Sequence, residues 1–259
     1  MALPILLYHH VGPARPGTHP WLTVAPERFQ TQMNWLLRRR YRVIDVEQMV
    51  AWAHGGRRLP ERAVAITFDD GYLDLAEHAF PVLASAGFPA TVFVVTEELG
   101  GRNTWDAGSS PGHPLLDEAA LLSWSRRGIE FGGHGRTHRD LTAMGLDKAR
   151  SEIGGSRRAL EALLDIPVRA FAYPYGRVNP SVRDLAAAHY RLAFTIREGR
   201  NGSRSDPFAL HRTMVHTGET ALQLAQKVRF GWAPTQLTRQ WAGSLRKGVS
   251  ERYRASTRR

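Results

Sequence analysis

Short apolar runs alternate with helix-like segments along almost the whole chain, and this alternation most restricts the possible folds. Strand-like runs occupy Ile5–Tyr8, Ala63–Phe68, Ala90–Val95, Ile129–Gly132, Ala170–Tyr173 and Leu192–Ile196. Apolar residues at helical spacing mark Glu27–Arg40, Asp74–Ala86, Asp117–Arg127, Asp147–Leu164 and Pro180–His189 between them. Such regular alternation predicts a parallel sheet with crossover helices, either open or closed into a barrel.

The length and composition fit one large α/β domain better than a disordered or fibrous chain. The chain has 259 residues, of which 42% are hydrophobic and 23% are charged. It contains no cysteine, which excludes disulfides, thiolate metal sites and a cysteine nucleophile. We predict one domain over residues 1–229 and an appended basic extension over residues 230–259.

The strongest local signal is Thr-Phe-Asp-Asp-Gly at residues 67–71, where the second strand-like run ends. Active sites of α/β folds form at the carboxyl ends of strands. Two adjacent carboxylates buried there repel each other unless a cation or a shared proton relieves them. Asp-Asp-Gly is equally typical of an ordinary turn, and the pentapeptide alone does not separate the two interpretations.

A second signal, His-Gly-Arg-Thr-His at residues 134–138, follows another strand-like run. Histidines at positions i and i+4 share one face of a helical turn and commonly bind one metal ion, although chance pairs in solvent are frequent. With Asp70, His134 and His138 form a two-histidine, one-carboxylate set that leaves coordination positions open. Zinc suits this set, and cobalt, nickel or iron also fit it.

Two more strand ends carry candidate residues. Tyr173, Pro174, Tyr175 and Gly176 offer a rigid aromatic wall and an exposed backbone N–H, or simply a strand end with a turn. The run Tyr-His-His at residues 8–10 ends the first strand, where a histidine serves either as a general acid near neutral pH or as a core residue.

Taken in this order, the four signals resemble the NodB-homology polysaccharide deacetylases, carbohydrate esterase family 4. The resemblance covers roughly Pro4 to Thr213. Residues 67–71 match the first family motif throughout, residues 134–138 match the second in both histidines and Thr137, and residues 174–176 match the end of the third. The early Tyr-His-His run is similar to the branch that acts on poly-N-acetylglucosamine-type exopolysaccharides.

The resemblance implies an irregular (β/α) barrel, here with a basic helical tail. It also implies metal-dependent removal of N-acetyl groups from an N-acetylglucosamine-containing polysaccharide or glycoconjugate. By position, Asp70, His134 and His138 would hold the metal. Asp69 would be the general base, the Tyr175 backbone N–H would hold the oxyanion, and His9 would protonate the leaving amine. We expect substrate contacts from Tyr173, Pro174, Trp105, His10 and His211.

The sequence departs from the family pattern in four places. Gly135 stands where serine or threonine is usual, and Ala172 stands where many members have an arginine that orients the base. Arg169 is the nearest arginine in sequence. The Asp-x-x-x-Trp motif is absent after Ile196. The Leu-His motif has a counterpart at residues 210–211, which makes His211 a second candidate for the acid, ahead of His10 and His216; we favour His9.

The C-terminal segment carries much of the net charge of +11. Residues 236–259 contain seven arginines and lysines against one acid, with an apolar residue every four positions from Leu237 to Tyr253. This pattern fits an interfacial helix on anionic lipid or a helix docked on the barrel. Because the charge concentrates there and no recognition motif appears, we expect no nucleic-acid partner.

The N-terminus lacks a basic region and a small-residue cleavage site, and no stretch is long and apolar enough to cross a membrane. We therefore expect a protein without a signal peptide, cytoplasmic or peripheral at the membrane, unless a leader has already been removed. Two other functions remain open: an amide or formamide hydrolase with a smaller substrate, and a non-catalytic carbohydrate-binding relative. The intact Asp69, Asp70, His134 and His138 argue against the second.

Overall fold

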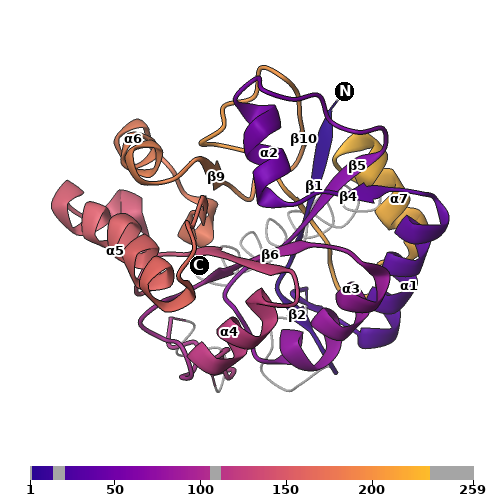
Figure 1. Ribbon diagram of the computed structural model, residues 1–259, viewed down its shortest axis with the longest axis horizontal. Coiled ribbons are helices and arrows are strands. Elements are labelled where there is room, and N and C mark those ends of the chain that lie inside the picture. Colours follow the sequence, from indigo (N-terminus) through magenta and orange to yellow (C-terminus); the bar gives the residue numbers. More distant parts are fainter. Residues whose placement is uncertain (1, 14–20, 106–111, 234–259) are drawn as a thin grey trace, which may run out of the picture.

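The computed structural model describes residues 2–13, 21–105 and 112–233, and it contains one curled sheet surrounded by helices (Figure 1). The main strands are β1 (Leu3–Tyr8), β5 (Ala63–Phe68), β6 (Ala90–Val94), β7 (Ile129–Gly133), β8 (Ala170–Ala172) and β9 (Leu192–Phe194). Shorter strands are β2 (His10–Val11), β3 (Thr23–Val24), β4 (Arg42–Val43), β10 (Arg200–Asn201) and β11 (Thr213–Met214). The helices are α1 (Pro26–Arg38), α2 (Val46–Ala53), α3 (Phe80–Ala86), α4 (Glu118–Ser125), α5 (Leu146–Leu164), α6 (Pro180–His189) and α7 (Ala221–Phe230).

The main sheet runs in the order β10-β1-β5-β6-β7-β8-β9, and all neighbours from β1 to β9 are parallel. Helices connect successive parallel strands, so the parallel sheet with crossover helices is confirmed. All six expected long strands and all five expected helices form, with ends shifted by at most two residues except in one case. That case is residues 74–86, which divide into a π-helical turn, Leu75–Ala79, followed by α3.

A short return segment bridges the gap between the last parallel strand and the first. Leu210 forms a parallel bridge with Phe194 at the end of β9, and three residues later β11 pairs with β1. Residues 210–214 therefore run between the two ends of the parallel sheet and complete the irregular barrel. The side chain of Arg212, in the middle of this segment, is fully buried.

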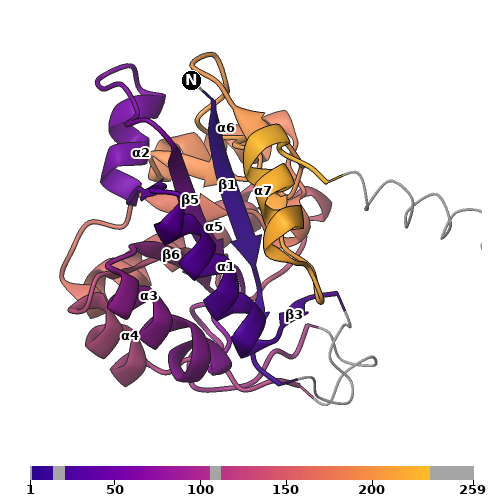
Figure 2. The same ribbon diagram turned by 90° about the vertical axis from the view of Figure 1, so that its right-hand side faces the viewer.

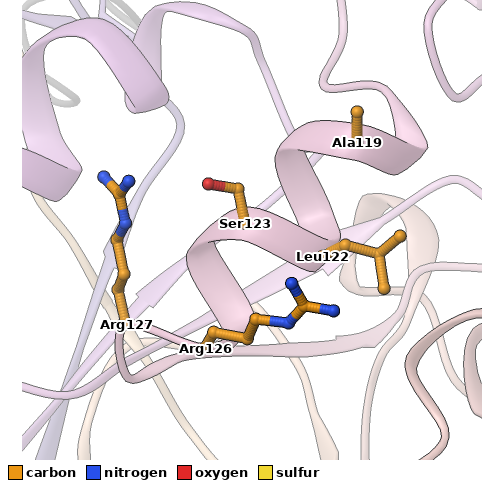
Figure 3. Close-up of a pocket in the computed structure, with 5 residues that line it drawn as sticks. All are labelled: Ala119, Leu122, Ser123, Arg126 and Arg127. Atoms are coloured by element: carbon orange, nitrogen blue, oxygen red, sulfur yellow. The ribbon is translucent and has the colours of Figure 1, made fainter.

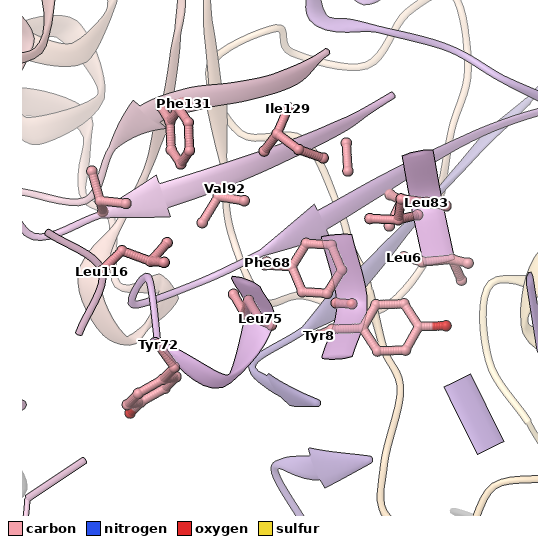
Figure 4. Packing of buried hydrophobic residues seen from close by; sticks show 14 of the residues in the cluster. Leu6, Tyr8, Phe68, Tyr72, Leu75, Leu83, Val92, Leu116, Ile129 and Phe131 are labelled. Atoms are coloured by element: carbon pink, nitrogen blue, oxygen red, sulfur yellow. The ribbon is translucent and has the colours of Figure 1, made fainter. Parts of the chain in front are cut away.

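Alternating side chains give each strand an inner and an outer face. In β1 and β5 the inner residues include Leu3, Ile5, Ala63 and Ala65, which pack with Phe93 and with α2. The outer residues pack against the surrounding helices in a larger cluster that includes Leu6, Tyr8, Phe68, Leu83 and Val92 (Figure 4). Asp69 continues the inner face beyond the end of β5, which directs its carboxylate towards the barrel axis.

Helix α2 covers the end of the barrel where the strands begin. Its buried residues Met49 and Trp52 join the inner cluster, and its first turn carries a capping box between Asp45 and Gln48. This helix was not predicted from the sequence, although Asp45 followed by Gln48 before an apolar run is a recognisable start signal. The other unpredicted helix, α7, begins with the same kind of capping box at Thr220.

Glu130, on the inner face of β7, makes the fold sensitive to pH. Its carboxylate accepts a hydrogen bond from the Val46 N–H at the start of α2, at 2.9 Å. Burial raises the pKa of Glu130 to about 7, against the opposing effect of that hydrogen bond. A carboxyl group whose pKa is higher in the folded state stabilises the fold below its unfolded pKa, and this contribution is lost as the pH rises through the folded value.

We therefore expect the melting temperature to fall as the pH rises from 5 to 8. Glu130→Gln, which keeps the shape of the protonated side chain, should flatten that dependence. The free energy of unfolding that wild type loses up to pH 8, relative to Glu130→Gln, should be about 3 kcal/mol, because the pKa rises from 4.5 to about 7 and one pKa unit corresponds to about 1.4 kcal/mol. Thermal unfolding across this pH range measures it, with the exposed Glu118→Gln on α4 as control. Parallel pH curves for wild type and Glu130→Gln would contradict the expectation.

Within the described residues, no helix combines the length and the apolar character that crossing a bilayer requires. Helix α7 lies beside β1 and α1 (Figure 2) and ends at Gly231, whose left-handed conformation stops the helix. The predicted amphipathic helix from Leu237 to Tyr253 lies outside the described residues. The division at residue 229 stays a prediction.

Candidate active site

Two adjacent carboxylates lie where β5 ends, and a backbone turn lets both face the barrel opening. Asp70 has φ of +72° and Gly71 has φ of +74°. A Cβ on Gly71 would lie 2.7 Å from Val94 Cγ1, so the close approach as well as the conformation requires glycine there. In a strand, successive side chains point to opposite faces of the sheet, and the strained conformation of Asp70 ends this alternation. It aims this carboxylate at the histidines that follow β7.

Asp70, His134 and His138 form a compact donor set. One ligand atom from each lies within 4.8 Å of the others, and all three residues are buried. The Nε2 atoms of His134 and His138 lie 3.4 Å and 3.3 Å from the same oxygen, Asp70 Oδ1. The predicted two-histidine, one-carboxylate set is therefore assembled in the fold.

The second nitrogen of His134 is held by the neighbouring strand. Its Nδ1–H donates to the backbone carbonyl of Ala172 at 2.8 Å, which leaves Nε2 as the ligand atom. Burial by itself would raise the pKa of Asp70, but hydrogen bonds from His134 and His138 hold it well below its ordinary value. Asp70 is therefore a carboxylate near neutral pH, as a metal ligand must be.

Glu152 on α5 fixes the loop between the two histidines. Its carboxylate accepts hydrogen bonds from the backbone N–H groups of Arg136 and Thr137 at 2.7 Å and 2.9 Å, and from the Thr137 hydroxyl at 2.8 Å. A Cβ on Gly135 would lie 3.1 Å from the same carboxylate, and its φ is +80°. This accounts for glycine where the family pattern has serine or threonine. The Arg136 side chain pairs with Glu97.

Arg212 supplies a cation for Asp69 that was not predicted from the sequence. Its Nη1 and Nη2 donate to the two carboxylate oxygens of Asp69 at 2.6 Å and 2.7 Å, and both side chains are buried. Burial would raise the pKa of Asp69, but the charge of Arg212 and then of His134 lowers it below its ordinary value. Arg169, nearest to the family position in sequence, instead pairs with Glu47. The only signal in the sequence was the position of Arg212 beside the Leu-His pair.

The candidate acids occupy very different surroundings. His9 lies close enough to Asp69 and Asp70 for their charges to raise its pKa, although burial lowers it further and the net change is downward. Its buried Nδ1 makes no hydrogen bond within the described structure. The His211 ring instead packs against Gly199, and its backbone N–H donates to Asn201. His211 therefore does not join the site.

Two residues expected to touch substrate belong to the core instead. His10 is 3% exposed; its Nδ1 lies 2.7 Å from Asp74 Oδ2 and its ring stacks on Tyr72. Tyr173 is fully buried, and its hydroxyl donates to the Phe208 carbonyl at 2.8 Å. The reason is strand alternation, which turns Tyr173 to the outer face of the barrel.

Aromatic side chains border the histidine ligands. The Trp105 ring stacks on His138 with centroids 4.4 Å apart, and the Tyr175 ring meets His138 edge-on at 4.7 Å. Pro174 is buried beside the loop of residue 135, and Tyr175 has φ of +58°. Three of the six non-glycine residues with positive φ in the described chain are Asp70, His138 and Tyr175, so backbone strain concentrates at this site.

Residues 56–192, just over half of the chain, match the family described as polysaccharide deacetylase. The chain belongs to this family. The poly-β-1,6-N-acetyl-D-glucosamine N-deacetylase of Staphylococcus epidermidis (strain ATCC 35984) is 27% identical over 206 residues, which cover 74% of this chain and 68% of that protein.

Solved structures agree with the fold of this polysaccharide deacetylase. The Streptococcus pyogenes deacetylase PplD, in complex with acetate, has a TM-score of 0.78 and 25% identity over 88% of this chain and 98% of that one. IcaB from Ammonifex degensii has a TM-score of 0.75 and 23% identity over 88% and 97%, a likeness in fold. The irregular barrel expected from the resemblance is thereby confirmed.

The donor set fits the metal dependence that belongs to this family. Two imidazoles and one carboxylate, buried and convergent, bind a divalent ion and leave positions open for water and substrate.

His134→Ala should remove the bound metal together with activity. The loss of affinity should exceed the roughly 10- to 100-fold cost of removing an outer partner of a ligand. Elemental analysis of purified protein measures it, and His211→Ala, which should keep its metal, is the matched control. Full metal content in His134→Ala would contradict the assignment.

Proposed function

We propose that this polysaccharide deacetylase removes N-acetyl groups from a poly-β-1,6-N-acetylglucosamine-type polysaccharide with zinc held by Asp70, His134 and His138. The observation that carries the proposal is the pairing of Asp69 with Arg212 directly beside this donor set. A structural turn has no need of a buried ionised carboxylate next to three metal donors. The name of the staphylococcal relative supports the choice of polymer.

Each step of amide hydrolysis has a residue suited to it. Bound zinc supplies a water of lowered pKa and polarises the acetyl carbonyl. Asp69, kept ionised by Arg212, accepts the proton of the attacking water. The backbone N–H of Tyr175 donates to the developing oxyanion. His9 donates a proton to the sugar nitrogen as the C–N bond breaks, which releases acetate and a free amine.

The aromatic border of the site suits a sugar ring. Trp105 and Tyr175 both contact His138, and Tyr175 is 42% exposed. Flat aromatic faces pack against the apolar faces of sugars while their edges stay in water. We place the N-acetylglucosamine unit that is cleaved between these two rings, with its acetyl group towards Asp69.

Acetate release from β-1,6-linked N-acetylglucosamine oligomers tests the proposal, with β-1,4-linked oligomers as the matched substrate. We expect release from the β-1,6 series by the zinc-loaded wild type and by His211→Ala.

His9→Ala should keep its metal and lose about 100-fold or more in rate, in the range for loss of general acid catalysis. A zinc-loaded wild type that releases acetate from neither series would overturn the substrate assignment, and small formamides and amides would be assayed next. Full activity of His9→Ala would overturn its role as the acid.

A further inference from the structure

A cavity lies between α1 and α7, at the opposite end of the barrel from the metal donors. Its volume is about 760 Å³, and its walls include Ala2, Pro4 and Ala63, where β1 and β5 begin. The metal donors and Asp69 instead follow strand ends. We call this cavity the α1/α7 groove; its side walls are formed by Trp35 and Tyr41 on one side and by Leu222, Ala225 and Val228 on the other.

The α1/α7 groove is strongly cationic. Arg39, Arg62, Arg200 and Arg229 line it, and no aspartate or glutamate does. Arg62 donates to the Arg39 carbonyl at 2.6 Å, and Arg200 donates to the carbonyls of Arg229 and Ala2 at 2.7 Å and 2.8 Å. Among the described residues, no salt bridge joins any of these four arginines to a carboxylate. The groove therefore holds four positive charges, two of them fixed in place by the backbone.

Large apolar side chains are also exposed on α7 and just beyond its end. Leu222 is 70% exposed, Phe230 is 54% exposed and Trp232, just beyond the helix, is 41% exposed. Within the groove the rings of Trp35 and Tyr41 lie 5.3 Å apart. Arginines beside exposed leucine, phenylalanine and tryptophan are the composition of a surface that rests in the headgroup region of an anionic bilayer.

We propose that the α1/α7 groove and the exposed end of α7 dock on an anionic phospholipid surface, with headgroup phosphates among the four arginines. The chain segment that follows α7 is not a suitable occupant of the groove. Residues 236–259 carry a net charge of +6, and the four arginines of the groove repel like charges. Docking here directs the deacetylase site away from the bilayer. The proposal does not depend on which sugar polymer is the substrate.

Co-sedimentation of the full chain with vesicles tests the proposal. Wild type and the double variant Arg39→Gln with Arg229→Gln are each tested on two kinds of vesicle. One kind contains phosphatidylcholine alone, and the other contains phosphatidylcholine and the anionic phosphatidylglycerol. Each arginine near an anionic bilayer contributes about 1 kcal/mol, so this variant should bind the anionic vesicles about thirtyfold more weakly. Its melting temperature and its acetate release from soluble oligomers should equal those of wild type.

The matched control is Arg126→Gln with Arg127→Gln. These two exposed arginines border a smaller hollow on α4 (Figure 3), and their replacement removes the same net charge elsewhere. This control should keep wild-type binding. Equal binding by the groove variant and wild type, or equal weakening by both variants, would overturn the proposal, because the tail or net charge alone would then explain binding. Saturable binding of glycerol phosphate in the groove without vesicle binding would overturn the lipid assignment in favour of a soluble phosphate ligand.

Discussion

Replacing Asp69 by asparagine is expected to lower kcat by about 100- to 10,000-fold, the range for loss of a general base. Asparagine has nearly the same shape and still accepts a hydrogen bond from Arg212, but it cannot take a proton from water at neutral pH. Asp70, His134 and His138 keep their donor atoms, so the metal content should stay at that of wild type. Acetate release and elemental analysis of the same preparation measure both quantities.

The control for this prediction separates loss of the base from loss of the fold. Asp74→Asn changes another carboxylate near the opening, one that pairs with His10 and does not touch the metal donors. We expect Asp74→Asn to keep most of its activity. Wild-type kcat in Asp69→Asn would show that Asp69 is a structural residue and not the base. Loss of the metal in Asp69→Asn would show that Asp69 is a metal ligand.

Arg212→Ala is expected to have the largest effect on stability together with a large effect on rate. Removing one partner of a buried ion pair costs about 3–5 kcal/mol, because the other charge is left buried without compensation. Without Arg212, only the charges of His134 and His9 oppose the effect of burial, so the pKa of Asp69 rises. Because the base must be ionised, the acidic limb of the pH–rate profile should move to higher pH. Chemical denaturation and pH-dependent kcat measure the two effects.

Arg212→Lys distinguishes a positioning role from a purely structural one. Lysine keeps the positive charge but cannot form the two parallel hydrogen bonds that hold Asp69 at 2.6 Å and 2.7 Å. We expect it to restore most of the stability and the position of the acidic limb, while kcat stays low and KM changes little. A lysine variant with wild-type kcat would show that charge alone is needed, and an unchanged pH profile in Arg212→Ala would contradict the role.

The fold was predictable where the hydrophobic period is long and unambiguous. The run of residues 63–68 appears as a strand with the predicted bounds, and residues 180–189 appear as the predicted helix. The two-residue strands β4, β10 and β11 could not be predicted, because two residues carry no measurable period and pair only after their neighbours are placed. Helix α2 was missed in spite of the capping box at its start.

The site was predictable where its residues lie close together in the sequence and form a recognisable motif. Asp69 and Asp70, and the two histidines four residues apart, are each local patterns, and the fold brings the three metal donors together. His10 and Tyr173 were misplaced because a strand turns neighbouring residues to opposite faces. One residue of register decides between the site and the core. The local sequence does not determine which face of a strand points into the barrel.

The sequence by itself determined the alternation of strands and helices, the strand-end motifs and the donor types of the metal set, because each depends on residues close together in the chain. Only the tertiary structure decided which cation pairs with Asp69. Arg212 lies 143 residues from Asp69, and the two meet because the return segment 210–214 bridges the gap between β9 and β1. The buried carboxylate needs a charge of opposite sign, and any strand that reaches the barrel axis can supply it. Asp69 therefore has a buried cationic partner, although Ala172 stands where many family members have an arginine.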